Sequence, residues 1–282
     1  MKSPEFLTSK GVDLQKSLEL FGNIETYNDT VGEFIVGTAN KTNKLKEYMA
    51  IKDLANYATY VHSLKSDAKY FGFNKLADKA FEHEQKSKEG DITYVYQHFN
   101  DLVASVNEAI AIVNEYLRGE PDQPTVIEQP APAVSETTAP TQESVVEKLE
   151  QSYAEPTILV VDDSNIIRNF TRRIFESKYA VGTAKNGQEA IDIIDANKDS
   201  DKIVAILLDL NMPKVDGFAV LQYMQDNNMF EKIPVSIISG DSSKETIHNA
   251  YKYPIVDMLG KPFNENDVKR VVEKTIMYKE LS

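Results

Sequence analysis

Three carboxylates in the second half of the sequence each follow an apolar run that is typical of a buried strand. Residues 157–161 lead directly into Asp162 and Asp163, and residues 205–208 lead into Asp209. Because the carboxyl ends of parallel strands meet at one edge of a sheet, we expect these side chains to lie close together. Carboxylates that repel one another favour a hard divalent cation with oxygen ligands, so the pattern indicates a site for a cation such as Mg²⁺.

Two other polar side chains also follow apolar runs. Residues 233–238 precede Ser239, and a run that ends at Leu259 leads through Gly260 to Lys261. A strand-terminal Asp or Ser by itself is often only the N-cap of the next helix. Three carboxylates, a hydroxyl and an ammonium group at the ends of four strands favour a functional site instead.

Residues 155–282 resemble a response-regulator receiver domain over their whole length. The resemblance implies an α/β fold, flavodoxin-like and doubly wound, with a five-stranded parallel sheet. It implies that Asp209 accepts a phosphoryl group, that Asp162 and Asp163 form the acidic pair that holds Mg²⁺, and that Ser239 is the switch hydroxyl. Lys261 matches the lysine of the family and is followed by Pro262, the expected cis proline.

The expected metal ligands are the three carboxylates and one backbone carbonyl. We expect Asp163 and Asp209 to coordinate Mg²⁺ directly, Asp162 to act mainly through water, and the carbonyl of Asn211 to complete the set. Asp209 would attack phosphorus and become an acyl phosphate. The Lys261 ammonium and the Ser239 hydroxyl would then hold the phosphoryl oxygens.

One position departs from the receiver pattern. The family usually has Tyr or Phe three residues before the lysine, and this sequence has Met258. Methionine is flexible and lacks a ring. We therefore expect a weaker response to phosphorylation at the face formed by the last strand and helix.

Composition limits the remaining possibilities. The chain has 282 residues, which suggests about two domains, and a net charge of −13, which argues against nucleic acid or an anionic membrane as a partner. It has no cysteine, no signal-peptide core and no apolar run of membrane-spanning length. We expect a cytoplasmic protein.

Residues 119–154 are rich in Pro and Glu and predict a disordered linker.

Residues 1–118 predict an all-α domain, because their apolar residues recur with helical periodicity. Five helices are expected, near 12–21, 26–48, 52–71, 74–88 and 91–117. Gly22, Gly72 and Gly90 mark breaks between them, and Asn74 and Asp91 are candidate N-caps. The four longer helices suit an up-down four-helix bundle.

The third expected helix contains His62 outside its apolar stripe, which predicts a solvent-facing imidazole. Lys65, Ser66 and Lys69 share its face. Two nearby ammonium groups make a poor metal site, but Lys65 could pair with the oxygens of a phosphoryl group on His62. The alternative is a solvated helix face with an incidental histidine.

This alternative is our interpretation of the other three histidines, which lack such surroundings. They are His83, His98 and His248.

Residues 1–118 resemble a histidine phosphotransfer (HPt) domain through His62, Leu64, Lys65, Phe71 and Gly72. Ser66 replaces a more usual Gly, and Asp67 a small residue. The resemblance implies that His62 is phosphorylated and exchanges its phosphoryl group with receiver aspartates. The implied partners are a histidine kinase and other receiver or HPt domains.

The leading hypothesis is a phosphorelay protein that is not an enzyme, since a receiver catalyses only its own phosphorylation and dephosphorylation. A second hypothesis is the regulatory N-terminal part of a longer effector whose output domain lies beyond Ser282. A third, a haloacid-dehalogenase-like aspartyl-phosphate phosphatase, is disfavoured because the first strand ends in Asp-Asp rather than Asp-x-Asp. The sequence gives no signal for an oligomeric state. A linker of this length has a root-mean-square span of roughly 30–36 Å, so His62 could reach Asp209 within one chain.

Overall fold

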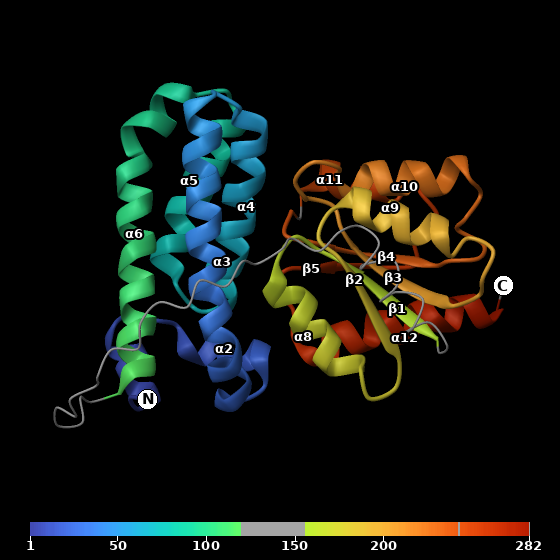
Figure 1. Cartoon of the computed structure of the whole chain (residues 1–282), viewed down its shortest axis with the longest axis horizontal. Helices are drawn as coiled ribbons and strands as arrows, with labels where there is room; N and C mark the ends of the chain where they lie inside the picture. The colour runs from blue at the N-terminus through green and yellow to red at the C-terminus, as the bar shows by residue number, and fades with distance from the viewer. Residues whose placement is uncertain (120–155, 242, 282) are drawn as a thin grey trace, which may run out of the picture.

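The computed structural model describes residues 1–119, 156–241 and 243–281, and it places a helical bundle beside an α/β domain (Figure 1). Apart from Gly119, the segment predicted as a disordered linker lies outside the described residues. Among the described residues, none of the helices is both long enough and apolar enough to cross a membrane.

The first 118 residues are helical, as predicted. The helices are α1 (Pro4–Ser9), α2 (Leu14–Phe21), α3 (Ile24–Ala50), α4 (Leu54–Tyr70), α5 (Asn74–Lys88) and α6 (Ile92–Arg118). Each of α3 to α6 packs on the next, and α6 returns to pack on α3, so the four long helices form the expected bundle. Helix α1 was not predicted, because six residues are too few to show helical periodicity.

The helices begin and end near the residues that the sequence suggested, with one exception among the predicted N-caps. Asp91 accepts a hydrogen bond from the backbone N–H of Tyr94, which confirms it as the N-cap of α6. Asn74 was wrong as an N-cap, because it already lies in the first turn of α5 and the cap position is occupied by Phe73. Gly72 adopts a φ of +75°, and a Cβ there would lie 2.6 Å from the carbonyl oxygen of Asp13.

The second domain is a five-stranded parallel sheet with helices on both faces. Its strands are β1 (Thr157–Val161), β2 (Ala180–Ala184), β3 (Ile203–Asp209), β4 (Val235–Ser239) and β5 (Met258–Gly260), in the order β2-β1-β3-β4-β5. Its helices are α8 (Asn165–Phe175), α9 (Gly187–Ala196), α10 (Gly217–Asp226), α11 (Lys244–Ala250) and α12 (Glu265–Leu281). Helices α8 and α12 cover one face, and α9, α10 and α11 lie on the other (Figure 1). This is the predicted doubly wound fold.

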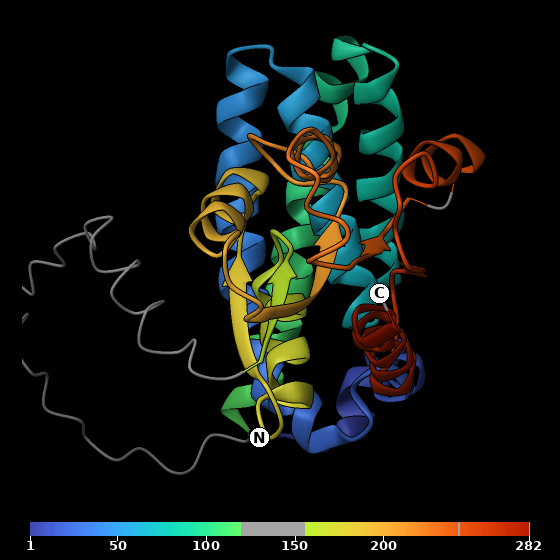
Figure 2. The same cartoon turned by 90° about the vertical axis from the view of Figure 1, so that its right-hand side faces the viewer.

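The two domains share an apolar core. The sheet face under α8 and α12 belongs to the same buried cluster as the interior of the bundle. Figure 1 shows the two domains side by side, and in Figure 2 the α/β domain lies in front of the bundle; helix α8 contacts α3. The chain therefore brings the end of its sheet against one flank of the bundle.

Candidate functional site

The three predicted carboxylates lie together at the carboxyl edge of the sheet. Asp162 and Asp163 follow β1, and Asp209 ends the neighbouring strand β3. One carboxylate oxygen from each can be chosen so that all three lie within 4.8 Å of one another. Asp162 and Asp209 are buried, and Asp163 is half-buried. Parallel pairing of β1 and β3 explains the cluster, because it places both strand ends at one level.

Lys261 supplies the opposing charge within this cluster. Its Nζ lies 2.6 Å from Oδ2 of Asp162 and 2.6 Å from Oδ2 of Asp209. Burial and the repulsion of Asp162 and Asp163 raise the pKa of Asp209 to about 7, although the Lys261 ammonium acts against the shift. Burial alone would lower the pKa of Lys261, but the carboxylates outweigh it and raise this pKa. The peptide bond from Lys261 to Pro262 is cis, as the resemblance implied.

The donor set fits a hard divalent cation. Three clustered carboxylates carry more negative charge than one ammonium group offsets, and their oxygens are the ligands that Mg²⁺ prefers. The backbone N–H of Asn211 donates to Oδ1 of Asp209 at 3.1 Å, which fixes the loop after β3 beside the cluster. Coordination by the Asn211 carbonyl stays a prediction.

Ser239 and Gly217 complete the rim around Asp209. Ser239 ends β4 next to β3, and its Oγ accepts from the backbone N–H of Asp241 at 3.1 Å. A Cβ on Gly217 would overlap the backbone of Asp209, so only glycine lets α10 begin so close to the end of β3. The predicted switch hydroxyl thus lies on the same rim as the carboxylates.

His62 is not exposed to solvent, which corrects the sequence-based expectation. It projects from the expected face of α4, yet only 3% of its surface is exposed. The receiver-like domain covers it, because a Cβ built at Gly240 would lie 2.7 Å from Nε2 of His62. Gly240 directly follows Ser239, so the imidazole lies against the rim that carries Asp209.

Glu84, which the sequence analysis missed, holds the other side of the imidazole. Its Oε1 lies 2.8 Å from Nδ1 of His62, and its Oε2 accepts from Nζ of Lys65 at 2.6 Å. Lys88 also donates to Oε1 at 2.7 Å. Lys65 is therefore paired with Glu84, and its contact with phosphoryl oxygens stays a prediction.

The charges around His62 favour a neutral imidazole with a free Nε2. Burial and the ammonium groups of Lys65 and Lys261 lower the pKa of His62, although the hydrogen bond with Glu84 opposes them. Burial would raise the pKa of Glu84, but its bond with His62 and the charge of Lys65 lower it. An ionised carboxylate only accepts, so Nδ1 carries the proton. The lone pair of Nε2 then faces the sheet rim, and Nε2 has no hydrogen-bond partner among the described residues.

We expect Glu84→Ala to lower the free energy of unfolding by about 3–5 kcal/mol, because removing one partner of a buried ion pair leaves the other charge uncompensated. Urea denaturation followed by circular dichroism measures the change. Glu108→Ala is the control, since Glu108 pairs with Lys75 at an exposed site and its loss should cost less than about 1 kcal/mol. Equal effects of the two variants would contradict the role of Glu84 as the buried partner of His62 and Lys65.

The other histidines have separate surroundings. His83 is buried, with Nδ1 2.8 Å from the Tyr57 hydroxyl and Nε2 3.2 Å from the carbonyl oxygen of His98. His98 is half-buried, and His248 is exposed. His83 therefore has a packing role, and the interpretation from sequence that it lies on a solvated helix face was wrong, because the Tyr57 hydroxyl and the His98 carbonyl hold it inside the bundle.

A half-open cleft connects the acidic cluster with the outside. It lies between the bundle and the sheet rim, has a volume of about 590 Å³, and its lining includes Tyr60, Asp67, Asp163 and Arg168. Asp163 is thus the carboxylate that small ions reach first while the two domains are in contact.

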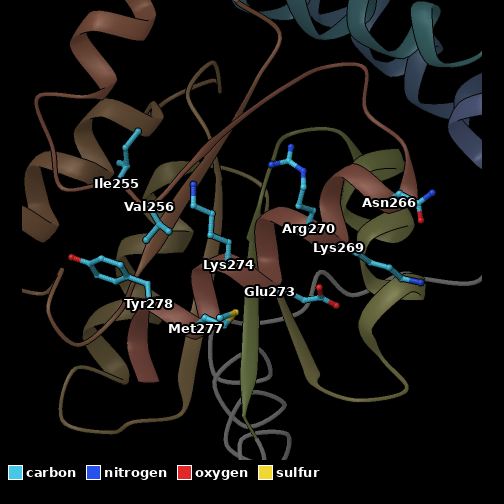
Figure 3. Close-up of a pocket in the computed structure, with 9 residues that line it drawn as sticks. All are labelled: Ile255, Val256, Asn266, Lys269, Arg270, Glu273, Lys274, Met277 and Tyr278. Carbon is cyan, nitrogen blue, oxygen red and sulfur yellow. The ribbon is translucent and has the colours of Figure 1, made fainter. Parts of the chain in front are cut away.

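A second groove of about 700 Å³ follows the outer face of α12 and the segment before β5 (Figure 3). Lys274, Met277 and Tyr278 line its α12 side, and Ile255 and Val256 face them. Met258, at the usual aromatic position, lies just beyond this segment at the start of β5 and is half-buried.

We expect beryllofluoride, a phosphoryl mimic, to cause only a weak change in amide exchange over residues 251–260, because Met258 offers no ring to change position. Exchange near residues 209–212 should fall and serves as the control for binding of the mimic. A large, localised protection change over residues 251–260 would contradict this prediction.

A family model described as the response regulator receiver domain matches residues 158–273. The two-component response regulator ORR3 of Oryza sativa subsp. indica is 31% identical over 124 residues, which cover 44% of this chain and 92% of that protein. The chemotaxis protein CheY1 of Helicobacter pylori is 31% identical over 121 residues, which cover 41% of this chain and 93% of that protein.

One longer match and one solved structure add to these. The CAI-1 autoinducer sensor kinase/phosphatase CqsS of Vibrio cholerae is 29% identical over 181 residues, covering 62% of this chain and 25% of that protein. The solved receiver domain of the Francisella response regulator 1452 is 30% identical, with 45% of this chain and 99% of that domain covered at a TM-score of 0.39.

Proposed function

Because this chain belongs to the response regulator receiver family through residues 158–273, we propose that it is a phosphorelay protein that carries phosphoryl groups on Asp209 and on His62. The observation that carries the proposal is the position of His62. Its Nε2 is buried, lacks a hydrogen-bond partner among the described residues and lies against the rim beside Asp209. Residues 1–118 would then act as an HPt domain.

The proposed transfer is a displacement at phosphorus. A carboxylate oxygen of Asp209 forms the new O–P bond, the N–P bond to Nε2 of His62 breaks, and its electron pair returns to the imidazole. Lys261 already contacts Asp209, so its ammonium group is in place to hold the phosphoryl oxygens together with the Ser239 hydroxyl. Mg²⁺, held by Asp163, Asp209, the Asn211 carbonyl and water on Asp162, would neutralise charge on the transferring group.

The contact of the Glu84 carboxylate with Nδ1 of His62 suits both directions of transfer. Glu84 keeps the proton on Nδ1, so the lone pair of Nε2 is free to accept a phosphoryl group. The phosphoryl group would lie on Nε2, whereas Lys65 pairs with Glu84 on the Nδ1 side of the ring, with its Nζ 3.4 Å from Nδ1. Lys65 would therefore have to leave Glu84 to reach the new oxygens, and Glu84 is the residue that orients the imidazole.

The proposed partners are a histidine kinase and other receiver or HPt domains. The match to a sensor kinase/phosphatase supports this, because it extends over 62% of the chain and so beyond the receiver domain alone. Since two-component response regulators are signalling proteins, the chain would have no substrate other than the phosphoryl group it carries.

Chemical stability of the label tests the two sites separately. With a small acyl phosphate as donor, Mg²⁺-dependent and base-labile label should map to Asp209 and vanish in Asp209→Ala. With a phosphoramidate donor, acid-labile and base-stable label should map to His62 and vanish in His62→Gln. Mass spectrometry locates each label. Label on other residues, or aspartyl label that persists in excess chelator, would refute the proposal.

A further inference from the structure

We infer that the phosphotransfer partner of His62 is the receiver of the same chain, and that Gly240 is the residue that admits His62 to its rim. This inference rests on the proposed function and names the partner of that site. It follows from three groups of contacts between the bundle and the receiver. These are buried polar contacts, a cluster of aromatic rings, and the packing of the His62 imidazole against Gly240.

The polar contacts join α4 to the receiver next to its acidic cluster. The Ser164 hydroxyl, one residue beyond Asp163, donates to Oδ1 of Asp67 at 2.8 Å. Lys41 from α3 pairs with the other oxygen of Asp67. The backbone N–H of Phe263 donates to the Tyr70 hydroxyl at 3.1 Å. Each of these groups is buried, so the contacts form in a site from which water is excluded.

Four aromatic rings close a cycle across the same interface. Phe21 and Tyr70 come from the bundle, and Phe170 and Phe263 come from the receiver. Centroid distances around the cycle are 6.0 Å from Phe21 to Phe170, 6.4 Å from Phe170 to Phe263, 5.9 Å from Phe263 to Tyr70 and 6.4 Å from Tyr70 to Phe21. All four rings are at least 96% buried. Buried aromatic clusters of this kind dominate the affinity of protein interfaces.

Gly240 provides the seat for the imidazole. A Cβ at this position would lie 2.7 Å from Nε2 of His62, 3.1 Å from Cε1 of the same ring and 3.2 Å from Oγ of Ser66. Gly240 does not have the positive φ that favours glycine, so the backbone itself accepts alanine. Because Glu84 holds Nδ1 from behind, the ring cannot move aside without breaking its hydrogen bond. The missing side chain is therefore required by the docked histidine.

The docked position joins the two proposed carriers. Gly240 follows β4, and β4 pairs directly with β3 at Asp209. Nε2 of His62 thus lies over the strand ends where Asp209, Ser239 and Lys261 meet. A segment of about 36 residues links the domains, and tethering of this kind gives an effective concentration on the order of millimolar. We therefore expect transfer within one chain to exceed transfer between chains at micromolar protein.

The test uses the full chain and starts transfer with metal. His62 is loaded with phosphoramidate in excess chelator, the donor is removed, and Mg²⁺ is added to begin transfer to Asp209. In the wild type, the first-order rate constant should not change over an about 100-fold dilution. Gly240→Ala should slow this step by about tenfold or more, because the added methyl group overlaps the ring.

Gly260→Ala is the matched control. Gly260 ends β5 on the same rim, lacks a positive φ, and a Cβ there would meet nothing within 4 Å. This variant should transfer at the wild-type rate. Both variants should accept phosphoryl groups at Asp209 from a small acyl phosphate as the wild type does.

The possible outcomes distinguish failure of this inference from failure of the proposed phosphorelay function. An observed wild-type rate constant that falls in proportion to dilution overturns the inference while both label sites stand. A Gly240→Ala variant that transfers as fast as Gly260→Ala does the same. Failure of Asp209 to take phosphoryl from the small donor would instead refute the proposed function. Loss of small-donor labelling in Gly240→Ala alone would mean that the methyl group damages the receiver, and would overturn the assigned role of Gly240.

Discussion

Lys261→Met is expected to lower the free energy of unfolding by about 3–5 kcal/mol when divalent cations are chelated. The variant leaves the buried carboxylates of Asp162 and Asp209 without the ammonium group that lies 2.6 Å from each. Breaking a buried ion pair by removing one partner typically costs this amount, because an uncompensated charge stays in the interior. Urea denaturation in excess chelator measures the loss.

Mg²⁺ should restore much of this stability but not the transfer reaction. A divalent cation offsets the repulsion between the carboxylates, so the stability gained from saturating Mg²⁺ should be larger in Lys261→Met than in the wild type. Labelling of Asp209 from a small acyl phosphate should still fall by about 100-fold, as expected when a charged group that contacts the transferring oxygens is lost.

Lys274→Met is the control for this prediction. Lys274 is a lysine of the same domain that pairs with Asp257, but its side chain is 55% exposed. Exposed pairs contribute less than about 1 kcal/mol, so this variant should keep both stability and labelling. A Lys261→Met protein as stable in chelator as Lys274→Met would show that the carboxylates do not depend on the ammonium group.

The sheet rim could be predicted from sequence because its signals are local. Asp162, Asp163 and Asp209 each follow an apolar strand, and parallel pairing brings all such ends to one edge. The strand over residues 180–184 was not located in this way, since its Ala, Gly and Thr residues at the sheet edge are half-buried and form no apolar run. Strand β4 begins at Val235, two residues later than predicted, because Pro234 has no N–H for the ladder.

The surroundings of His62 could not be predicted, because they come from residues distant in the sequence. Helical periodicity shows which face of α4 is apolar but not what covers the other face. The receiver rim at Gly240 covers the imidazole of His62, and Glu84 on the next helix contacts its Nδ1. A weak signal for Glu84 existed, since it lies on the apolar stripe of α5 with Ala77 and Ala80, where an acid needs a partner.

Ser164→Ala is expected to change transfer within a chain and transfer between chains in opposite directions. The Ser164 hydroxyl donates to the buried carboxylate of Asp67 across the interface, and such a bond to a charged acceptor contributes about 1.5–3 kcal/mol. Its loss should increase the fraction of open molecules, in which the bundle and the receiver are not docked on each other, by about 10- to 100-fold. Because His62 and Asp209 are both buried in the docked state, only open molecules can exchange phosphoryl groups with another protein.

Transfer between chains is measured with two full-length variants. An Asp209→Ala chain loaded at His62 serves as the donor, and a His62→Gln chain serves as the acceptor. Adding Ser164→Ala to both should accelerate this transfer by about tenfold or more, while Ser164→Ala alone should slow transfer within one chain. Ser200→Ala is the control, because Ser200 lies in the loop before β3, at the opposite edge of the sheet, and its hydroxyl donates to the carbonyl oxygen of Asn197 in its own turn.

A double-mutant cycle with Asp67→Asn identifies the contact responsible. Asp67 and Ser164 share one hydrogen bond, so the effects of the two changes on the open fraction should not add. Additive effects would place the two residues in independent roles. A between-chain rate that stays constant or falls together with the internal rate would mean that docking does not restrict access to His62. Opposite changes would instead mean that one interface both promotes internal transfer and excludes other receivers.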